Sequence, residues 1–214
     1  MHGVAAAASE NEGQPSEENK KPKAPQRARG QRRVKELLAA ASDLFVEKGF
    51  EATTMTEIAQ RAGASIGSLY QFFPTKEALA DILCADSGDF MCTEWSKLRD
   101  ADNITNPEEV VTQLLSIASR MTNKFPSFVP LHSIRGAPGI NLEKARVRMS
   151  QTLDSLLARK LPKLSKSEIT PIGLVVREML RFYIDVGNVA QLHVSRRAKS
   201  EIHAMLVLYF QAKM

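Results

Sequence analysis

The chain has 214 residues, of which 43% are apolar and 25% charged, and its formal net charge is +5. This is the composition of an ordinary globular protein with a sizeable core. No window approaches the roughly 18 uninterrupted apolar residues of a membrane helix, the N-terminus lacks the pattern of a secretory signal, and the two cysteines make no disulfide framework. We therefore expect a cytoplasmic protein that does not contact the membrane.

Residues 1–28 are rich in Ala, Glu, Lys, Pro and Gln and contain no aromatic residue. Such a segment cannot bury enough apolar surface to offset its ordering entropy, so we predict a disordered tail. Eight basic residues and no acidic one lie between Lys20 and Lys35. A basic block of this kind is typical of a protein that binds a polyanion such as nucleic acid, but a merely solvated tail has the same pattern.

Residues 29–83 are predicted to form the first folded domain. Apolar residues at helical spacing between Val34 and Phe45 predict its first helix, and Gly49 is placed to end that helix in a left-handed conformation. Thr54 and Glu57 then form a capping-box pattern, which predicts the start of a second helix.

Three further signals divide the rest of this domain. Gly63 ends the second helix, Ser65 is placed to cap a short third helix, and Pro74 prevents that helix from continuing. Thr75 is placed to cap a fourth, longer helix. The side chains of the third helix that we predict to face inward are Ile66, Leu69, Tyr70 and Phe73.

The second and third predicted helices have the features of a helix-turn-helix. Both are short and capped, and the small residues Ala59, Ala62 and Gly63 lie where the two backbones must approach. A helix that enters the major groove needs short or polar side chains on its outer face. The outer face of the third helix is predicted to contain Ser65, Gly67, Ser68, Gln71 and Phe72. The helix starts at Thr54 and Thr75, with Lys76 beside the latter, are predicted to meet DNA phosphates.

The same segment contains the motif Gly49-Phe50-x-x-Thr53-Thr54-Met55-x-x-Ile58-Ala59-x-x-Ala62-Gly63-x-Ser65-x-Gly67-Ser68-Leu69-Tyr70-x-x-Phe73-x-x-Lys76-Glu77-x-Leu79. Over residues 31–83 this motif resembles the DNA-binding domain of the TetR family of bacterial regulators. The resemblance implies a homodimer whose second domain senses a small molecule.

Carried over by position, the resemblance also implies which residues meet DNA. Tyr70 and Lys76 would contact phosphates, although Tyr70 could instead belong to the core. Phe72 stands where the family often has a histidine, and its ring can contact a thymine methyl but cannot hydrogen-bond a base. The complete set of implied DNA contacts is Thr54, Thr56, Ser65, Gly67, Ser68, Tyr70, Gln71, Phe72 and Lys76.

Helical spacing continues through residues 84–214, the predicted second domain. Pro107 is placed at the start of a helix, and residues 125–139, which three prolines and two glycines interrupt, are predicted to be short helix and loop. The remaining predicted helices cover residues 142–161, 169–189 and 195–213. Because no stretch alternates as a strand would, we expect an all-α protein of about nine helices.

The predicted helices at 169–189 and 195–213 are apolar around most of their circumference. A helix of this kind must be buried on two sides. We expect one side to pack on its own domain and the other on a second copy of the chain, as a four-helix bundle. Burial entirely within a monomer is the alternative.

Large, soft or polar-tipped side chains are predicted to surround a cavity in the second domain, which would suit a hydrophobic or aromatic effector. Each of them could equally serve as an ordinary core residue. His132 and Arg135 are the polar candidates. The full set is Phe90, Met91, Trp95, Met121, Phe125, Phe128, His132, Arg135, Met149, Phe182 and Tyr183.

Patterns for catalysis are weak. Residues 63–67 match the G-x-S-x-G pattern of a hydrolase, but that serine must follow a strand, and capping a helix explains Ser65 better. The histidines and cysteines show no ligand spacing. We therefore expect no enzyme, cofactor or metal site.

The prediction is a repressor that binds a palindromic double-stranded DNA operator as a homodimer and is released by a small effector. The alternatives are an activator of the same fold, or a helical small-molecule-binding protein with little DNA activity.

Overall fold

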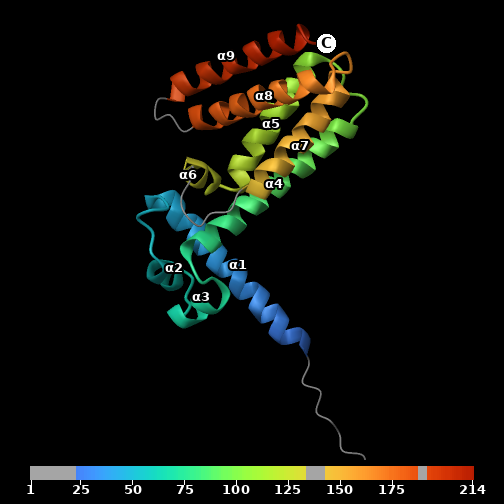
Figure 1. The fold of residues 1–214 in the computed structure, drawn as a ribbon. Helices are drawn as coiled ribbons and strands as arrows, with labels where there is room; N and C mark the ends of the chain where they lie inside the picture. The colour runs from blue at the N-terminus through green and yellow to red at the C-terminus, as the bar shows by residue number, and fades with distance from the viewer. Residues whose placement is uncertain (1–22, 134–142, 188–191) are drawn as a thin grey trace, which may run out of the picture.

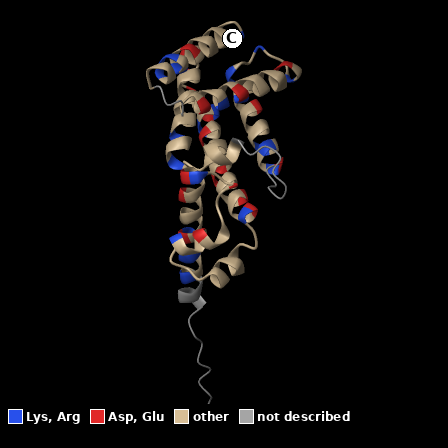
Figure 2. Ribbon diagram, turned by 90° about the vertical axis from the view of Figure 1, so that its left-hand side faces the viewer, with Lys and Arg blue, Asp and Glu red and all other residues tan. Residues whose placement is uncertain are grey.

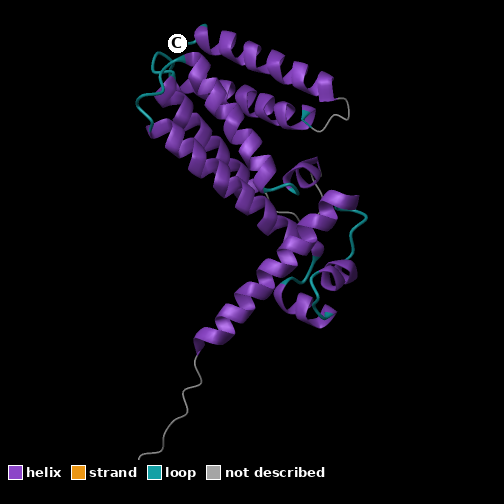
Figure 3. Ribbon diagram, turned by 180° about the vertical axis from the view of Figure 1, so that it is seen from behind, coloured by secondary structure: helices purple, strands orange, loops and turns teal. Residues whose placement is uncertain are grey.

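The computed structural model describes residues 23–133, 143–187 and 192–214. These residues form nine helices, with no strand among them (Figure 3), so the predicted all-α class is confirmed. None of the described helices is both long and apolar enough to cross a membrane. The helices are α1 (Lys23–Lys48), α2 (Met55–Arg61), α3 (Ile66–Phe72), α4 (Lys76–Asp100), α5 (Pro107–Lys124), α6 (Phe128–Ser133), α7 (Glu143–Lys160), α8 (Lys166–Val186) and α9 (Leu192–Gln211).

Helix α1 begins earlier than the sequence pattern predicts. Residues 23–28, which we predicted to belong to the tail, are helical. Ala24, Gln26 and Ala28 have good helix propensity, and Pro25 lies in the first turn, where its missing N–H costs no hydrogen bond. The predicted disorder of residues 1–22 falls outside the described residues.

The N-terminal domain consists of α1, α2, α3 and the beginning of α4 (Figure 1). Its core is a cluster that takes residues from all four helices, with Phe45, Ile58, Leu69 and Leu79 fully buried. Gly49 has a φ of 83° and ends α1 as predicted, because a left-handed residue stops a helix and glycine adopts it without strain.

Helix α4 continues from Lys76 to Asp100, so the domain boundary that we predicted after residue 83 lies within a helix. The sequence from 84 to 100 contains no proline, and its single glycine, Gly88, is buried against the side chain of Met149. Nothing therefore ends the helix at the boundary. Helix α4 is therefore one continuous helix that passes from the N-terminal domain into the larger domain (Figure 1).

In the larger domain, α4 packs along α7 and α5, while α8 packs against α7, α5 and α9. One continuous apolar core joins these helices and includes Trp95, Leu114, Leu156 and Phe210. The two last helices begin three residues before their predicted starts. For α8 the reason is a capping box between Ser165 and Glu168, a local signal that the sequence contains and that we did not use.

The short helix α6 connects the two domains. Leu131, at 1% exposure, belongs to the core of the N-terminal domain. Phe128, three residues earlier, packs on the core of the larger domain. Helix α6, which packs on both cores, and helix α4, which continues through both domains, therefore couple the two domains.

Candidate functional site

The face of α3 that points away from the N-terminal core is built from small, polar and aromatic side chains. Only Leu69 of this seven-residue helix is buried, together with Phe73 directly after it. We predicted that Ile66 and Tyr70 also face inward, and this is wrong, because their side chains are 41% and 52% exposed. A short helix at the edge of a small domain buries one narrow stripe, and Leu69 and Phe73 fill it.

The predicted caps are all present. Thr54 Oγ1 accepts a hydrogen bond from the backbone N–H of Glu57, whose carboxylate accepts one from the N–H of Thr54. Ser65 Oγ caps α3 by accepting from the N–H of Ser68, and Thr75 Oγ1 caps α4 by accepting from the N–H of Ala78. These bonds fix the entry of each helix.

The start of α2 is further tied to the end of α1. Lys48 pairs with the carboxylate of Glu57, and Arg61 at the end of α2 forms a two-bond pair with Glu47. The hydrogen bonds from Lys48 and Thr54 lower the pKa of Glu57 to about 2. The carboxylate therefore stays ionised and keeps both its capping bond and its ion pair at neutral pH.

The structure places the predicted DNA contacts on the exposed side of this domain. The side chains of Thr54, Thr56, Tyr70 and Gln71 are exposed, as is Gly67, while Ser68 is half-buried at the flank. Phe72 is 39% exposed and lies beside Phe73 at the end of α3. Helix α3 contains no charged residue, whereas basic residues recur along the N-terminal half of α1 (Figure 2).

Gly67 lies within α3, and a methyl group added there would meet no atom within 4 Å. Glycine inside a helix is less stable than alanine by roughly 0.5–1 kcal/mol. The fold therefore does not require a glycine at this position. A glycine would be required at position 67 if this surface has to approach another molecule closely.

Lys76 begins α4 as predicted, and its ammonium group has partners within the chain. Its ammonium group donates hydrogen bonds to the backbone carbonyls of Phe50 (2.7 Å), Thr53 (3.0 Å) and Glu51 (3.2 Å). It also lies 4.3 Å from the centre of the Phe50 ring. All three donors are thus used within the chain, and they join the first residue of α4 to the connection between α1 and α2.

Replacing Lys76 by methionine should weaken DNA binding indirectly. Three carbonyls lose their donor, which at about 1 kcal/mol for each hydrogen bond predicts a loss of roughly 1–3 kcal/mol in the free energy of unfolding. If Lys76 contacted a phosphate, its replacement would reduce the slope of log affinity against log salt concentration by about 1. We expect the slope to stay unchanged while affinity and melting temperature fall. A reduced salt slope with an unchanged melting temperature would instead show that Lys76 contacts a DNA phosphate directly.

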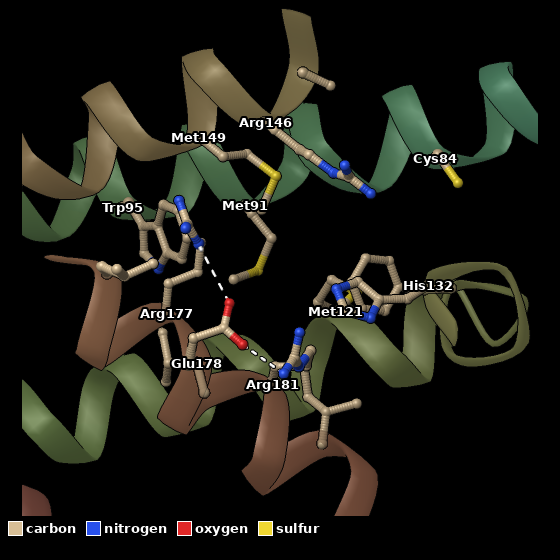
Figure 4. A pocket seen from close by; sticks show the side chains of 15 residues that line it. Cys84, Met91, Trp95, Met121, His132, Arg146, Met149, Arg177, Glu178 and Arg181 are labelled. Atoms are coloured by element: carbon tan, nitrogen blue, oxygen red, sulfur yellow. Dashed lines mark ion pairs between the residues drawn. The ribbon is translucent and has the colours of Figure 1, made fainter. Parts of the chain in front are cut away.

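The larger domain contains a partly open cavity of about 390 Å³ between α4, α5, α6, α7 and α8 (Figure 4). Six of the eleven predicted residues line it, one of which is Met91. The other five are Trp95, Met121, Phe128, His132 and Met149.

Four other predicted effector contacts do not line the cavity. Phe90 and Phe125 pack on each other, with ring centres 5.7 Å apart. Tyr183 lies under the ammonium of Lys199 and borders a separate cleft. Phe182 is 53% exposed on the outer side of α8. These residues are of the type that often lines a pocket. Whether a residue lines the cavity depends on the direction of its side chain, and residue type does not reveal that direction. Arg135 falls outside the described residues.

The cavity has a polar side that we missed. Arg146 of α7 and Arg177, Glu178 and Arg181 of α8 line it, together with Cys84 of α4. The positions 174, 177, 178 and 181 repeat at helical spacing, a signal that would have found this face of α8. Burial and the charge of Asp81 raise the pKa of the Cys84 thiol to about 12, so it stays protonated and unreactive.

Helices α8 and α9 lie side by side at the end of the molecule remote from α3 (Figure 1). Both expose large apolar side chains even though each also contributes to the core. We name this surface the α8–α9 face. It contains Val175 and Phe182 of α8 and Val194, Met205 and Leu208 of α9.

Comparison with known proteins gives consistent matches. Residues 37–82 match the model of the bacterial regulatory proteins of the tetR family. The chain is 33% identical over 90 residues to the HTH-type transcriptional regulator YdeS of Bacillus subtilis, which is 42% of either chain. It is 35% identical over 79 residues to the HTH-type transcriptional repressor KstR2 of Mycolicibacterium smegmatis, which is 37% of this chain and 38% of the relative. The matches thus span about two fifths of the length of these curated relatives.

A solved structure extends the similarity of fold to the larger domain. The TetR family regulator PfmR from Thermus thermophilus superposes with a TM-score of 0.61 at 21% identity, over 80% of this chain and 97% of that one. The family model covers the capped helices and the exposed face of α3 described above. Residues 37–82 therefore form a domain of the kind found in the bacterial regulatory proteins of the tetR family, and the fold of the chain as a whole is similar to that of PfmR.

Proposed function

We propose that the protein is a transcriptional regulator that binds a palindromic operator as a homodimer and releases it when a small molecule fills the cavity. The observation that carries the proposal is the outer face of α3. It combines exposed Tyr70 and Gln71 with a glycine, Gly67, that the fold itself does not require. A helix with this face can enter a major groove about 12 Å wide.

In this proposal, the residues of α3 read bases while their neighbours contact the backbone. Gln71 can form a two-bond contact with adenine, and Tyr70 can donate its hydroxyl proton to a phosphate. Thr56 is exposed on α2 and can reach the same strand. The exposed basic residues of α1, among them Arg29 and Arg32, would add attraction for DNA that does not depend on sequence.

The homodimer rests on the α8–α9 face. Exposed apolar side chains on two adjacent helices favour pairing with the same two helices of a second copy, because a two-fold interface is formed by the same patch on both chains. Such a dimer supplies the second recognition helix that a palindromic operator needs.

The signal from the cavity would travel through α4 and α6. Helix α4 contributes Met91 and Trp95 to the cavity, and its first residue, Lys76, is bonded to the connection before α2. Helix α6 contributes Phe128 and His132 to the cavity and Leu131 to the N-terminal core. A ligand that displaces either helix therefore moves the DNA-binding domain as well.

Release requires a ligand that distinguishes two states of the dimer. Moving an equilibrium from 1:99 to 99:1 takes about 5.5 kcal/mol of differential affinity.

We favour repression, because the similar protein KstR2 is named a repressor. An activator of the same fold would be revealed by a reporter gene whose expression falls when the protein is deleted.

Selection of bound duplexes from a random DNA library tests the proposal directly. We expect enrichment of an inverted repeat. Tyr70→Phe should then weaken binding to that site by about two- to tenfold, the value of one hydrogen bond. Gln71→Ala should weaken it by about fivefold to a hundredfold and relax the preference at one base pair of each half-site. A folded, dimeric protein that enriches no sequence would favour the alternative of a small-molecule-binding protein without DNA activity.

A further inference from the structure

The polar side of the cavity carries an excess of positive charge. Three guanidinium groups line it, from Arg146 on α7 and from Arg177 and Arg181 on α8. Glu178 is the one carboxylate among the described lining residues. Figure 4 shows Arg146 on α7, and Arg177 and Arg181 on α8 with Glu178 paired to both of them.

The single carboxylate does not neutralise the three cations. Glu178 pairs with Arg181 at 2.5 Å and lies 4.0 Å from Arg177. Arg177 also donates a hydrogen bond to the hydroxyl of Ser150. Among the described residues, Arg146 takes part in no ion pair, and it is exposed to solvent as well as lining the cavity. Cations that line a cavity without enough acidic partners favour an anionic ligand, since a partly enclosed site strengthens the attraction.

A second, independent observation points to a ligand atom on the apolar side. Trp95 is 1% exposed and lines the cavity, and its indole N–H has no hydrogen-bond acceptor in the structure. A buried donor without an acceptor costs roughly 1–3 kcal/mol. An oxygen of a bound ligand would remove that cost.

The rest of the wall is apolar and easily reshaped. Met91, Met121 and Met149 contribute flexible thioethers, and Leu180 and Ile184 contribute aliphatic side chains. Such a surface accommodates a flat ring or a hydrocarbon chain. The cavity therefore has one cationic side and one apolar side.

We propose that the effector is an amphipathic carboxylate, whose acid group binds the guanidinium groups of Arg146, Arg177 and Arg181 and whose apolar body packs on the methionines and Trp95. The planar guanidinium matches a carboxylate through two parallel hydrogen bonds. This inference rests on the proposed function, because it names the chemical class of the ligand that would release DNA.

Matched acid and amide probes test the proposal. Naphthalene-2-carboxylate and decanoate are compared with naphthalene-2-carboxamide and decanamide, which keep the shape and remove the charge. Isothermal titration with the purified full chain at pH 7.5 should show at least one acid binding about tenfold or more tightly than its amide, the value of a charge-assisted hydrogen bond. Equal binding of acid and amide, or binding of neither acid, would overturn the proposal.

Four variants locate the acid group. Arg146→Gln should weaken acid binding about tenfold and leave amide binding unchanged. Arg148→Gln is the matched control, since Arg148 lies on the same helix but pairs with Asp89 and does not line the cavity. Glu178→Gln should tighten acid binding by removing a repulsive charge. Trp95→Phe, which replaces the indole by a smaller aromatic ring, removes part of the surface on which the apolar body packs and should weaken the acid and the amide alike.

The titrations that test the carboxylate site and the DNA-binding assay that tests the proposed function can fail independently of each other. Binding of the selected DNA duplex is measured without any probe, and it tests the regulator proposal alone. If Arg146→Gln and Arg148→Gln bind the acid equally well, the carboxylate site is wrong even though DNA binding persists. If no duplex is bound but the acid and amide titrations give the expected difference, the site stands and the regulator proposal fails.

Discussion

Replacing both Phe182 and Leu208 by glutamate should convert the protein into a monomer and weaken operator binding more than a hundredfold. The two side chains are 53% and 66% exposed, so the charges lie in water while the chain is alone. In the proposed four-helix bundle the same positions are buried, and each dimer would contain four unpaired carboxylates. Burying an unpaired charge costs several kcal/mol, which exceeds the roughly 2.7 kcal/mol that corresponds to a hundredfold loss.

Sedimentation velocity at micromolar concentration measures the change in mass, and gel shift with the selected duplex measures the change in affinity. Val147→Glu provides the control, because Val147 is equally exposed at 49% but lies on α7, outside the α8–α9 face. Its mass and DNA affinity should match those of the unchanged protein. A double variant that remains dimeric with a normal melting temperature would place the dimer interface elsewhere.

The features that the sequence predicted correctly are mainly local. Thr54, Ser65 and Thr75 cap their helices through bonds that span three residues. Gly49 ends α1 through its own backbone angle. Such signals lie within one turn of the chain and do not depend on what packs against it. The order of the helices and the helix-turn-helix could therefore be predicted before the fold was known.

The features that the sequence did not predict depend on distant contacts. Lys76 looked like a free cation beside a helix start, but its partners lie more than twenty residues earlier in the chain. Which of several aromatic residues line the cavity depends on how α4, α7 and α8 are rotated against one another, so Trp95 lines it while Phe90 packs on Phe125. The arginines of the cavity were missed because exposed charges on a helix usually face solvent.

Replacing Gly67 by alanine should move stability and DNA affinity in opposite directions. Alanine is the better helix former, and the added methyl group meets no atom of the chain within 4 Å. The free energy of unfolding should rise by up to about 1 kcal/mol, which corresponds to a melting temperature roughly 2–4 °C higher for a protein of this size. Operator affinity should fall about tenfold or more, because a close contact between α3 and the groove can no longer form.

The two readouts, differential scanning calorimetry and fluorescence anisotropy with the selected duplex, together separate a folding role from a binding role. Ser116→Ala is the control, since Ser116 is exposed on α5 in the larger domain and its replacement also favours the helix without approaching DNA. It should raise the melting temperature slightly and leave affinity unchanged. If Gly67→Ala lowers stability, the glycine serves the fold. If instead it raises stability and leaves affinity unchanged, the outer face of α3 does not closely approach DNA, and the observation that carries the proposed function is lost.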